Sequence, residues 1–500
     1  MAPRFRLILA LCSLVLSGCS VFDGSPPDSP PTSVPVLNEP PPVGSPQPTP
    51  LPPQPGDRIP VSWNQVSPEN QQGELDRPFQ DLVKTNAAAG SDLWRVYTVT
   101  ADGAPHLERE TRRWVFSVFW LDGSNALLLG YSTRYTPRVN PQGGPRGASD
   151  SWGRGAEKLI PGKPGAAWDV QLPGTLSTVA PRGDFASLAA ADGALFLRTD
   201  GTLWEARLSG IDLDGGGAWS PDGRSLLFSQ RLGPPNYPEL PLQYIATPLG
   251  DQAVLVGSAF TLAWSADSSR LAFATEDRVS IFNVATAQTD SITLTSPLLG
   301  GFLSWSQDGR YIVARDGLID APAQRVIVQP SGREIIDASV SPDGRWLLMT
   351  TEVIQAQGLA CGAGRLANQT LLIDTATGAE RLLFDCDRFW ANVEWVDSQR
   401  FLAYTHTCWG CEGKSRLFLV SIDGAAQQLT DEFRAFLRYD ISPDGSKILV
   451  SGDEVRVYST TGVLLRSIPV DDGYTVTGVK WAPDGLSFAY IVGPTDFIVL

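Results

Sequence analysis

The sequence predicts an all-β fold made of repeated four-stranded sheets, and three observations lead to this prediction. The pattern Trp-Ser-Pro-Asp-Gly, followed by a short apolar run, returns in variant forms along most of the 500 residues. Alternating apolar residues precede the copies, which is typical of half-buried strands. The 48 glycines and 15 tryptophans are consistent with many short strands and turns. Segments with a helical repeat of apolar residues are almost absent.

One copy, Ala218 to Phe228, shows what each repeat encodes. In its Ser-Pro-Asp-Gly segment, Pro221 fixes φ at the second turn position and Gly223 accepts the positive φ that closes a tight hairpin. Each copy therefore reads as two antiparallel strands joined by a turn. Six further copies run from Ala263 to Phe273, Ser304 to Val313, Ser339 to Leu348, Glu394 to Ala403, Asp440 to Leu449 and Lys480 to Ala489.

The spacing of the copies indicates the architecture. Two more strands with an Asp-Gly or Thr-Gly turn follow a copy, so each unit is a four-stranded meander. The turn aspartates from Asp222 to Asp484 lie about 35 to 54 residues apart, which is the period of a propeller blade. Degenerate copies at Val115 to Tyr131 and Leu176 to Ala189 raise the literal count to nine. Because larger rings are rare, we expect a single β-propeller of about eight four-stranded blades, within a range of seven to nine.

The repeat W-S-P-D-G-x-x-[LI]-x-[FY] resembles that of TolB-like, WD-repeat-like propellers over roughly residues 115 to 500. This resemblance implies the propeller fold and interaction with envelope proteins. TolB-like proteins carry an additional N-terminal domain, and this chain has a Pro-rich segment there instead. The resemblance therefore concerns architecture more than any specific role.

The N-terminus predicts export and lipidation. Arg4 and Arg6 precede an apolar run from Leu7 to Leu16, which is the layout of a secretory signal. The segment Leu-Ser-Gly-Cys ending at Cys19 resembles the lipobox of bacterial lipoproteins, which implies lipidation of Cys19 and removal of residues 1–18. An ordinary signal peptide or a short membrane anchor is the alternative, although the run is too short to span a bilayer comfortably.

The remaining chain divides by composition. Residues 19–60, which start at the lipidated cysteine, are rich in Pro, Ser, Thr and Gly and predict a disordered tether with a reach on the order of 100 Å. Residues 61–92 form a polar lead-in or cap, and residues 93–500 form the propeller. Leu93 to Thr100 and His106 to Arg112 look like the second half of a blade. We expect them to complete the last C-terminal blade, because ring closure removes exposed sheet edges.

The long connections are expected on a single rim, the one reached after the second and fourth strand of each blade. They are residues 134–155, 231–241, 352–368 and 405–414. Function in a rigid scaffold concentrates in such loops, so this rim is the predicted working face. The first loop carries a basic and aromatic cluster that could bind an anionic glycan, an envelope polymer or an acidic partner, or could be a solvated insertion. Its residues are Arg134, Tyr135, Arg138, Arg146, Trp152 and Arg154.

Four further cysteines, Cys361, Cys386, Cys408 and Cys411, belong to the same predicted rim. An even number of loop cysteines outside the cytoplasm normally forms disulfides. The preferred pairing is Cys361 with Cys386 and Cys408 with Cys411, and other connectivities stay open. A zinc site including His406 and a redox Cys-x-x-Cys pair are the alternatives, but a redox pair usually opens a helix and no helix is signalled here.

Charge and motif content exclude several functions. The formal net charge of −15 becomes −17 once Arg4 and Arg6 leave with the signal, so nucleic acid is not an expected partner. The chain has no Gly-x-Ser-x-Gly nucleophile turn, only two histidines, and no Gly-rich phosphate loop between a strand and a helix. The repeated aspartates and tryptophans are explained by turn and core roles. No cofactor or metal is expected.

The sequence thus predicts a monomeric, lipid-anchored, extracytoplasmic propeller that binds a protein or an envelope polymer through its long-loop rim, without catalysis. The membrane is reached through lipid on Cys19. Ser20 after this cysteine resembles an outer-membrane signal if the host has two membranes; otherwise the outer face of the cytoplasmic membrane is expected. The alternative is a hydrolase or lyase that acts on an envelope glycan or peptide with carboxylates in the central depression.

Overall fold

A computed structural model describes the part of the chain that follows the Pro-rich segment. The described residues are 54–66, 93–100, 103–111, 113–121, 123, 125–132, 154–172, 174–190, 194–209, 211–213, 217–230, 240–259, 261–275, 278–294, 303–314, 317–328, 334–353, 367–384, 389–406, 415–430 and 438–494. The chain divides into two compact units, 1–52 and 53–500, and all of these residues belong to the second. The expected signal, Cys19 and most of the expected tether lie outside them.

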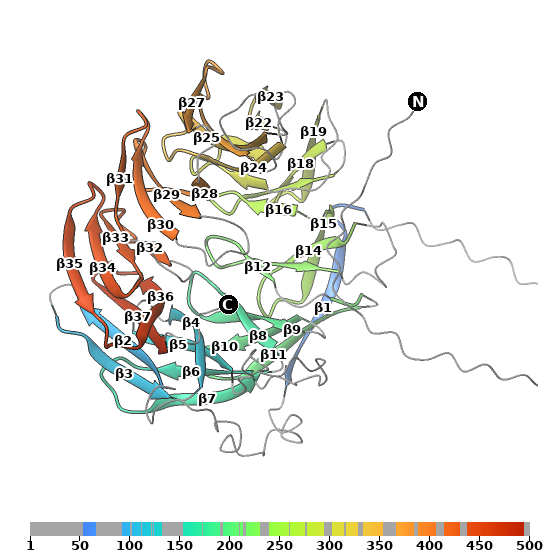
Figure 1. Cartoon of the computed structure of the whole chain (residues 1–500). Helices are drawn as coiled ribbons and strands as arrows, with labels where there is room; N and C mark the ends of the chain where they lie inside the picture. The colour runs from blue at the N-terminus through green and yellow to red at the C-terminus, as the bar shows by residue number, and fades with distance from the viewer. Residues whose placement is uncertain are drawn as a thin grey trace, which may run out of the picture. The chain divides into compact units, whose positions relative to one another are not determined.

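The described residues form an all-β structure of antiparallel meanders (Figure 1). They contain no α-helix, and hence none with the length and apolarity of a membrane-crossing segment. Six four-stranded sheets follow one another in chain order. They are β4 (Trp114–Leu121) to β7 (Ala166–Leu172) with β5 (Ala126–Ser132) and β6 (Arg154–Leu159); β16 (Thr261–Trp264), β17 (Arg270–Ala274), β18 (Arg278–Asn283) and β19 (Gln288–Thr293); β20 (Leu303–Trp305), β21 (Tyr311–Ala314), β22 (Gly317–Asp320) and β23 (Arg325–Val328); β24 (Glu334–Val340), β25 (Trp346–Val353), β26 (Ala367–Asp374) and β27 (Glu380–Phe384); β28 (Phe389–Trp395), β29 (Arg400–His406), β30 (Ser415–Ser421) and β31 (Ala426–Gln428); and β32 (Tyr439–Ile441), β33 (Lys447–Val450), β34 (Glu454–Ser459) and β35 (Leu464–Pro469).

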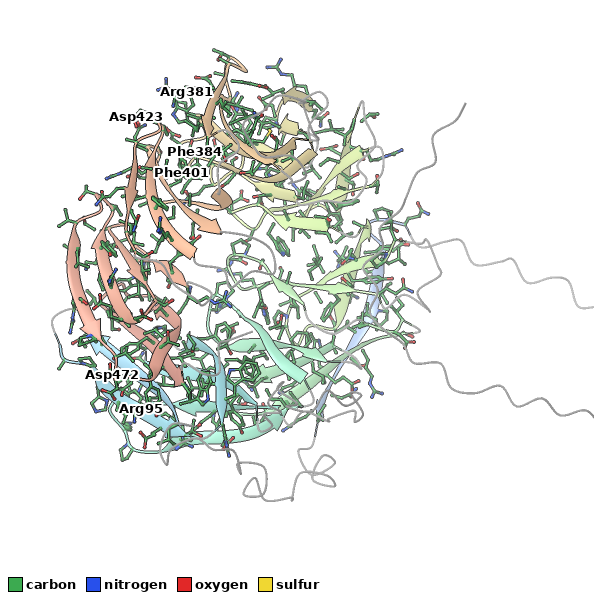
Figure 2. All side chains as sticks on the ribbon, viewed as in Figure 1. Arg95, Arg381, Phe384, Phe401, Asp423 and Asp472 are labelled. Atoms are coloured by element: carbon green, nitrogen blue, oxygen red, sulfur yellow. The ribbon has the colours of Figure 1, made fainter. Side chains whose placement is uncertain are left out.

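The seventh four-stranded sheet joins the two ends of the described chain. Its strands are β36 (Tyr474–Trp481), β37 (Ser487–Pro494), β2 (Trp94–Thr100) and β3 (His106–Thr111), in that order. β2 pairs antiparallel with β37, and Tyr97 stacks on Tyr490 with ring centroids 4.9 Å apart. Arg95 on β2, which is labelled in Figure 2, adds ion pairs of 2.9 Å to Glu110 and to Asp471. This pairing matches the expectation that N-terminal strands complete the last sheet.

The remaining sheet has nine strands and contains a feature that the sequence analysis missed. It consists of the meander β8 (Gly174–Val179), β9 (Phe185–Ala190), β10 (Ala194–Arg198) and β11 (Leu203–Leu208), the meander β12 (Ala218–Trp219), β13 (Leu226–Ser229), β14 (Leu242–Ala246) and β15 (Gln252–Ser258), and strand β1 (Arg58–Val66) between them. β1 pairs antiparallel with both fourth strands, β11 and β15 (Figure 1). The expected tether and polar lead-in therefore need correction, because residues 58–66 are a strand whose partners lie far away in sequence.

The hydrophobic core is divided among the junctions between consecutive sheets. Each of nine clusters unites side chains from two neighbouring sheets or meanders, as Leu348 and Leu372 do with Phe401. One cluster joins the last sheet to the first by packing Val96 and Ile491 against Val115. Burying a Leu, Ile or Phe side chain stabilises by about 1.5–3 kcal/mol, so each junction holds its two sheets together strongly. This arrangement is consistent with a β-propeller.

Counting the two meanders of the large sheet separately gives nine four-stranded units among the described residues. This is one more than the eight that we expected and lies within the expected range of seven to nine. The degenerate copies at Val115 to Tyr131 and Leu176 to Ala189 both form complete strand pairs, β4 with β5 and β8 with β9. Each of these pairs contains one register shift, and each belongs to a complete four-stranded unit, so both degenerate copies count as units.

Candidate functional site

The residues predicted as sites from the sequence lie almost entirely outside the described part of the chain. Only Arg154 is reached, as the first residue of β6, and its side chain is not described. Outside the described residues lie Cys19, Cys361, Cys386, Cys408, Cys411, Arg134, Tyr135, Arg138, Arg146 and Trp152. The lipidation, the disulfides and the basic binding loop therefore stay predictions.

The strand bounds nevertheless show from which sheet ends the predicted loops leave. In an antiparallel meander, connections after the second and the fourth strand leave from the same end. The four cysteines fall in residues 354–366 between β25 and β26, 385–388 between β27 and β28, and 407–414 between β29 and β30. All three connections thus leave from equivalent ends of two sheets that pack on one another through β24 and β28.

The opposite ends of the sheets are closed by short turns whose polar groups bond to one another. Ser442 Oγ donates to Asp444 Oδ1 at 2.6 Å, and Asp444 Oδ1 also accepts the Ser446 amide at 3.1 Å. The hydrogen bonds from Ser442 and from Ser446 lower the pKa of Asp444 to about 2. The same Ser-to-Asp hydrogen bond occurs in four other repeats, with Ser220, Ser265, Ser306 and Ser341 as donors. The turn role expected for these aspartates agrees with this geometry.

Charged side chains on three consecutive first strands form the best candidate site among the described residues. These residues occupy the same repeat position, two places before the turn. They are Glu394 on β28, Asp440 on β32 and Lys480 on β36. The other four repeats have Ala or Ser there. First strands are edge strands of their sheets, and β36 packs against the neighbouring first strand β32. We call Glu394, Asp440 and Lys480 the inner-strand triad.

An ion pair joins Asp440 and Lys480 of the triad across neighbouring sheets, and Glu394 interacts with both through charge. Lys480 Nζ lies 2.8 Å from Asp440 Oδ1, and Asp440 Oδ2 accepts the backbone amide of Trp481 at 2.6 Å. Burial raises the pKa of Glu394 and the charge of Asp440 raises it further, whereas a hydrogen bond with Tyr439 and the charge of Lys480 lower it. Glu394 therefore carries the least compensated charge of the triad.

Glu394 is accessible to water even though burial raises its pKa. An accessible carboxyl group with a raised pKa is a candidate proton donor, and the charge of Asp440 that acts on it makes this second carboxylate a candidate base or charge stabiliser. The described residues contain no group of three or more His, Cys, Asp or Glu side chains arranged to hold a metal ion.

A second cluster of charges lies between the sheet that joins the chain ends and the sheet β4–β7. Arg109 Nε lies 3.0 Å from Glu157 Oε1, Arg113 Nη1 lies 2.6 Å from Asp169 Oδ2, and Tyr131 donates to Asp169. Burial raises the pKa of Glu157, while the charge of Arg109 lowers it. Because the charges are paired with one another, this cluster joins two sheets and is a weaker candidate for chemistry.

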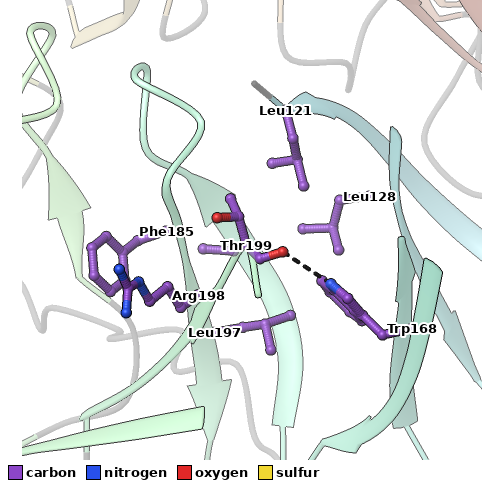
Figure 3. Close-up of a pocket in the computed structure, with 8 residues that line it drawn as sticks. Leu121, Leu128, Trp168, Phe185, Leu197, Arg198 and Thr199 are labelled. Atoms are coloured by element: carbon purple, nitrogen blue, oxygen red, sulfur yellow. Dashed lines mark hydrogen bonds between the residues drawn. The ribbon is translucent and has the colours of Figure 1, made fainter. Parts of the chain in front are cut away.

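A narrow crevice lies between β4–β7 and β8–β11 (Figure 3). Leu121, Leu128 and Leu197 line it, and Trp168 Nε1 donates to the Thr199 carbonyl at its edge over 2.9 Å. It has no space wide enough to admit a water molecule. It is therefore a packing defect and not a ligand pocket.

The sequence analysis missed the inner-strand triad, although a signal for it existed. When the repeats are aligned by their turns, the residue two positions before the turn is Ala, Ala, Ser, Ser, Glu, Asp and Lys in the seven successive copies. Three charged residues in consecutive copies of an otherwise small position mark a local departure from the core pattern. A column-by-column comparison of the repeats would have found it.

Comparison with known proteins identifies no family. No family model matches the chain, and no curated protein matches it. Its structure is distantly similar to β-propeller proteins. The β-propeller domain of the Trilobed protease from Pyrococcus furiosus is 14% identical over 53% of this chain and 87% of its own, with a TM-score of 0.36.

Two further solved structures share the same low level of similarity. An acylaminoacyl peptidase from Pyrococcus horikoshii is 15% identical over 51% of this chain and 46% of its own, with a TM-score of 0.33. An oligogalacturonate lyase from Vibrio parahaemolyticus is 13% identical over 63% of this chain and 78% of its own, with a TM-score of 0.35. At this level the similarities say nothing about activity.

Proposed function

We propose that this chain is a lipid-anchored, extracytoplasmic β-propeller of nine four-stranded blades, related to TolB-like propellers, that binds a protein or an envelope polymer without catalysis. The binding face is the end of the sheets from which the connections after second strands leave. The membrane is reached through lipid on Cys19, and disulfides among Cys361, Cys386, Cys408 and Cys411 restrain the binding loops.

The observation that carries this proposal is the unequal length of the connections at the two ends of the sheets. After the first strands, the chain returns within a few residues, as between β12 and β13 or β32 and β33. After the second strands of four sheets, the connections cover residues 133–153, 230–241, 354–366 and 407–414. Long segments on a rigid frame are where binding surfaces usually reside.

The short-turn end is a poor alternative for binding. Its carboxylates and hydroxyls already bond to one another, as Ser442 does with Asp444. A ligand at that end would have to replace these hydrogen bonds, at a cost of about 1 kcal/mol or more for each. Selective binding is therefore better supported at the other end.

A recovery experiment tests the proposal. The full-length protein and four variants, each with one long connection replaced by a short Gly-Ser turn, are used to recover partners from envelope extracts and to co-sediment with isolated cell-wall polymer. Arg224→Ser serves as a control at the opposite end, where the Arg224 side chain is largely exposed. We expect at least one shortened variant to lose its partner while Arg224→Ser keeps it. Equal recovery by all variants would refute the proposed face.

Membrane attachment is tested separately. Cys19→Ser should move the protein from the membrane fraction to the soluble fraction and abolish incorporation of labelled fatty acid. A variant that stays membrane-bound would contradict anchoring through Cys19.

A second candidate function, a hydrolase or lyase on an envelope glycan, is favoured only by the inner-strand triad. The raised pKa of water-accessible Glu394 next to Asp440 is the arrangement that general acid catalysis needs. Incubation of purified protein with isolated envelope glycans, followed by analysis of the released fragments, tests this function. Release by the wild type that is lost in Glu394→Gln would support it, and intact glycans would exclude it for these substrates.

A further inference from the structure

β1 connects two neighbouring meanders of the large sheet, β8–β11 and β12–β15, by pairing with a strand of each. Consecutive residues of β1 pair with different strands, Pro60 with Gln252 of β15 and Val61 with Leu208 of β11. The end of β11 therefore lies next to the start of β15, and β1 runs antiparallel along both. Pro60 has no amide hydrogen to donate, so its position at the crossing between the two partners leaves no ladder hydrogen bond unmade.

A tryptophan fixes β1 at this joint. Trp63 packs on Phe196 of β10 and on Phe228 of β13, with ring centroids 5.5 and 6.2 Å apart. Its Nε1 donates to the Gly250 carbonyl at 2.8 Å, and the buried Val61 donates its amide to the Asp251 carbonyl at 2.9 Å. The acceptor is thus a strand-binding edge formed by β11 and β15, with an aromatic slot formed by Phe196 and Phe228.

The pairing and packing contacts described for β1 are with residues more than 130 positions later in the chain. Nothing in this fit depends on which molecule supplies the strand. The segment 67–92, which joins β1 to β2, can reach on the order of 90 Å if extended. Exchange of an identical element between two copies keeps every contact and is a low-cost route to dimers.

We propose that β1 is an exchangeable strand, and that the edge formed by β11 and β15 accepts β1 from a second copy of this chain as well as from its own. Pairing along this edge is β-augmentation, in which the backbone supplies affinity and the Trp63 slot supplies specificity. The partner is therefore another copy of the same protein, and the exchanged dimer uses a surface different from the proposed binding face.

Concentration decides which arrangement dominates. Because β1 and its acceptor edge belong to one chain, the chain's own strand is present at the edge at an effective concentration on the order of millimolar. At a protein concentration of about ten micromolar, about one β1 strand in a hundred should therefore be exchanged between molecules. This fraction should rise about tenfold for each tenfold increase in protein concentration. Confinement to a membrane, which rests on the proposed lipid anchor, would increase the exchanged fraction.

Disulfide trapping across the β1–β11 pair tests the exchange. Ser62 lies opposite Arg207, both side chains are exposed, and antiparallel partners are close enough for a disulfide. Ser62→Cys and Arg207→Cys variants of the full chain are purified apart, mixed and oxidised. Only exchange brings the two new cysteines together, so disulfide-linked heterodimer should accumulate, and faster at higher concentration.

Two controls make the result decisive. The first control is a mixture of the Arg278→Cys and Thr293→Cys variants, whose positions lie opposite each other on β18 and β19. A short turn joins these two strands within one chain, so they should not exchange, and the mixture measures the background from native cysteines. The double variant Ser62→Cys/Arg207→Cys should cross-link within one chain. Heterodimer no more abundant than this background would overturn the exchange. Failure of the double variant to cross-link would overturn the β1–β11 pairing on which the exchange rests.

Discussion

Trp63→Ala tests whether β1 is held at the joint by the aromatic slot. The substitution removes two aromatic contacts, each worth about 0.5–1.5 kcal/mol beyond area, and one hydrogen bond worth about 1 kcal/mol. Because Trp63 is only partly buried, we expect a loss of about 2–4 kcal/mol in β1 docking. This corresponds to an increase in local opening of about 30-fold or more, since 1.4 kcal/mol equals a factor of ten.

Hydrogen–deuterium exchange is the assay, because it reports on β1 docking without global unfolding. The Leu255 amide donates to the Asp57 carbonyl, so peptides that cover β15 and β11 should exchange faster in Trp63→Ala. Peptides from β19 should not change. Gln65→Ala, an exposed position on β1, is the matched control and should behave like the wild type. Equal protection of β15 and β11 in Trp63→Ala and wild type would refute the reasoning.

Three other predictions concern charged residues. Ser442→Ala should raise the pKa of Asp444 from about 2 towards its ordinary value and cost about 1–3 kcal/mol, as measured by carboxyl NMR titration and urea unfolding; an Asp444 that titrates normally in the wild type would contradict this. Because the pKa of Glu394 is raised, its contribution to stability is complete below about pH 4.3 and is lost as pH rises through the raised value. Glu394→Gln should remove that pH dependence, and identical unfolding profiles between pH 4 and 7 would count against it. Arg109→Met should lower the free energy of unfolding by about 3–5 kcal/mol, because it leaves the buried Glu157 carboxylate unpaired. Adding Glu157→Gln should restore most of this loss in a double-mutant cycle. A loss under about 1 kcal/mol in the single variant would exclude the pairing.

Most of the architecture could be predicted because its signals are local. The turn Ser220 to Gly223 carries its own geometry, with Gly223 at φ +67° and Asp222 accepting the Ser220 hydroxyl. Short-range signals of this kind repeat in every copy, so strand pairs and their order follow from counting. The closing sheet could also be expected, because β2 and β3 formed half a unit at one end of the chain and β36 and β37 half a unit at the other.

β1 escaped prediction although its residues alternate in the manner of a strand. Ile59, Val61 and Trp63 point inwards, but the segment begins within a Pro-rich region and has no partner strand next to it in sequence. An isolated strand is recognised by its neighbours, and these lie in β11 and β15. The inner-strand triad left a signal in the repeats, but only the packing of neighbouring sheets brings Asp440 and Lys480 into contact.

The amino-acid order thus specifies the repeating hairpins, the short turns and the unequal connection lengths, because each depends on residues only a few positions apart. Folding in three dimensions decides where β1 docks, how many units the large sheet contains and which charges meet on the first strands. These features depend on contacts between residues that lie tens to hundreds of positions apart. Local patterns show which strands and turns form, but they do not by themselves specify which distant side chains the packed sheets bring together.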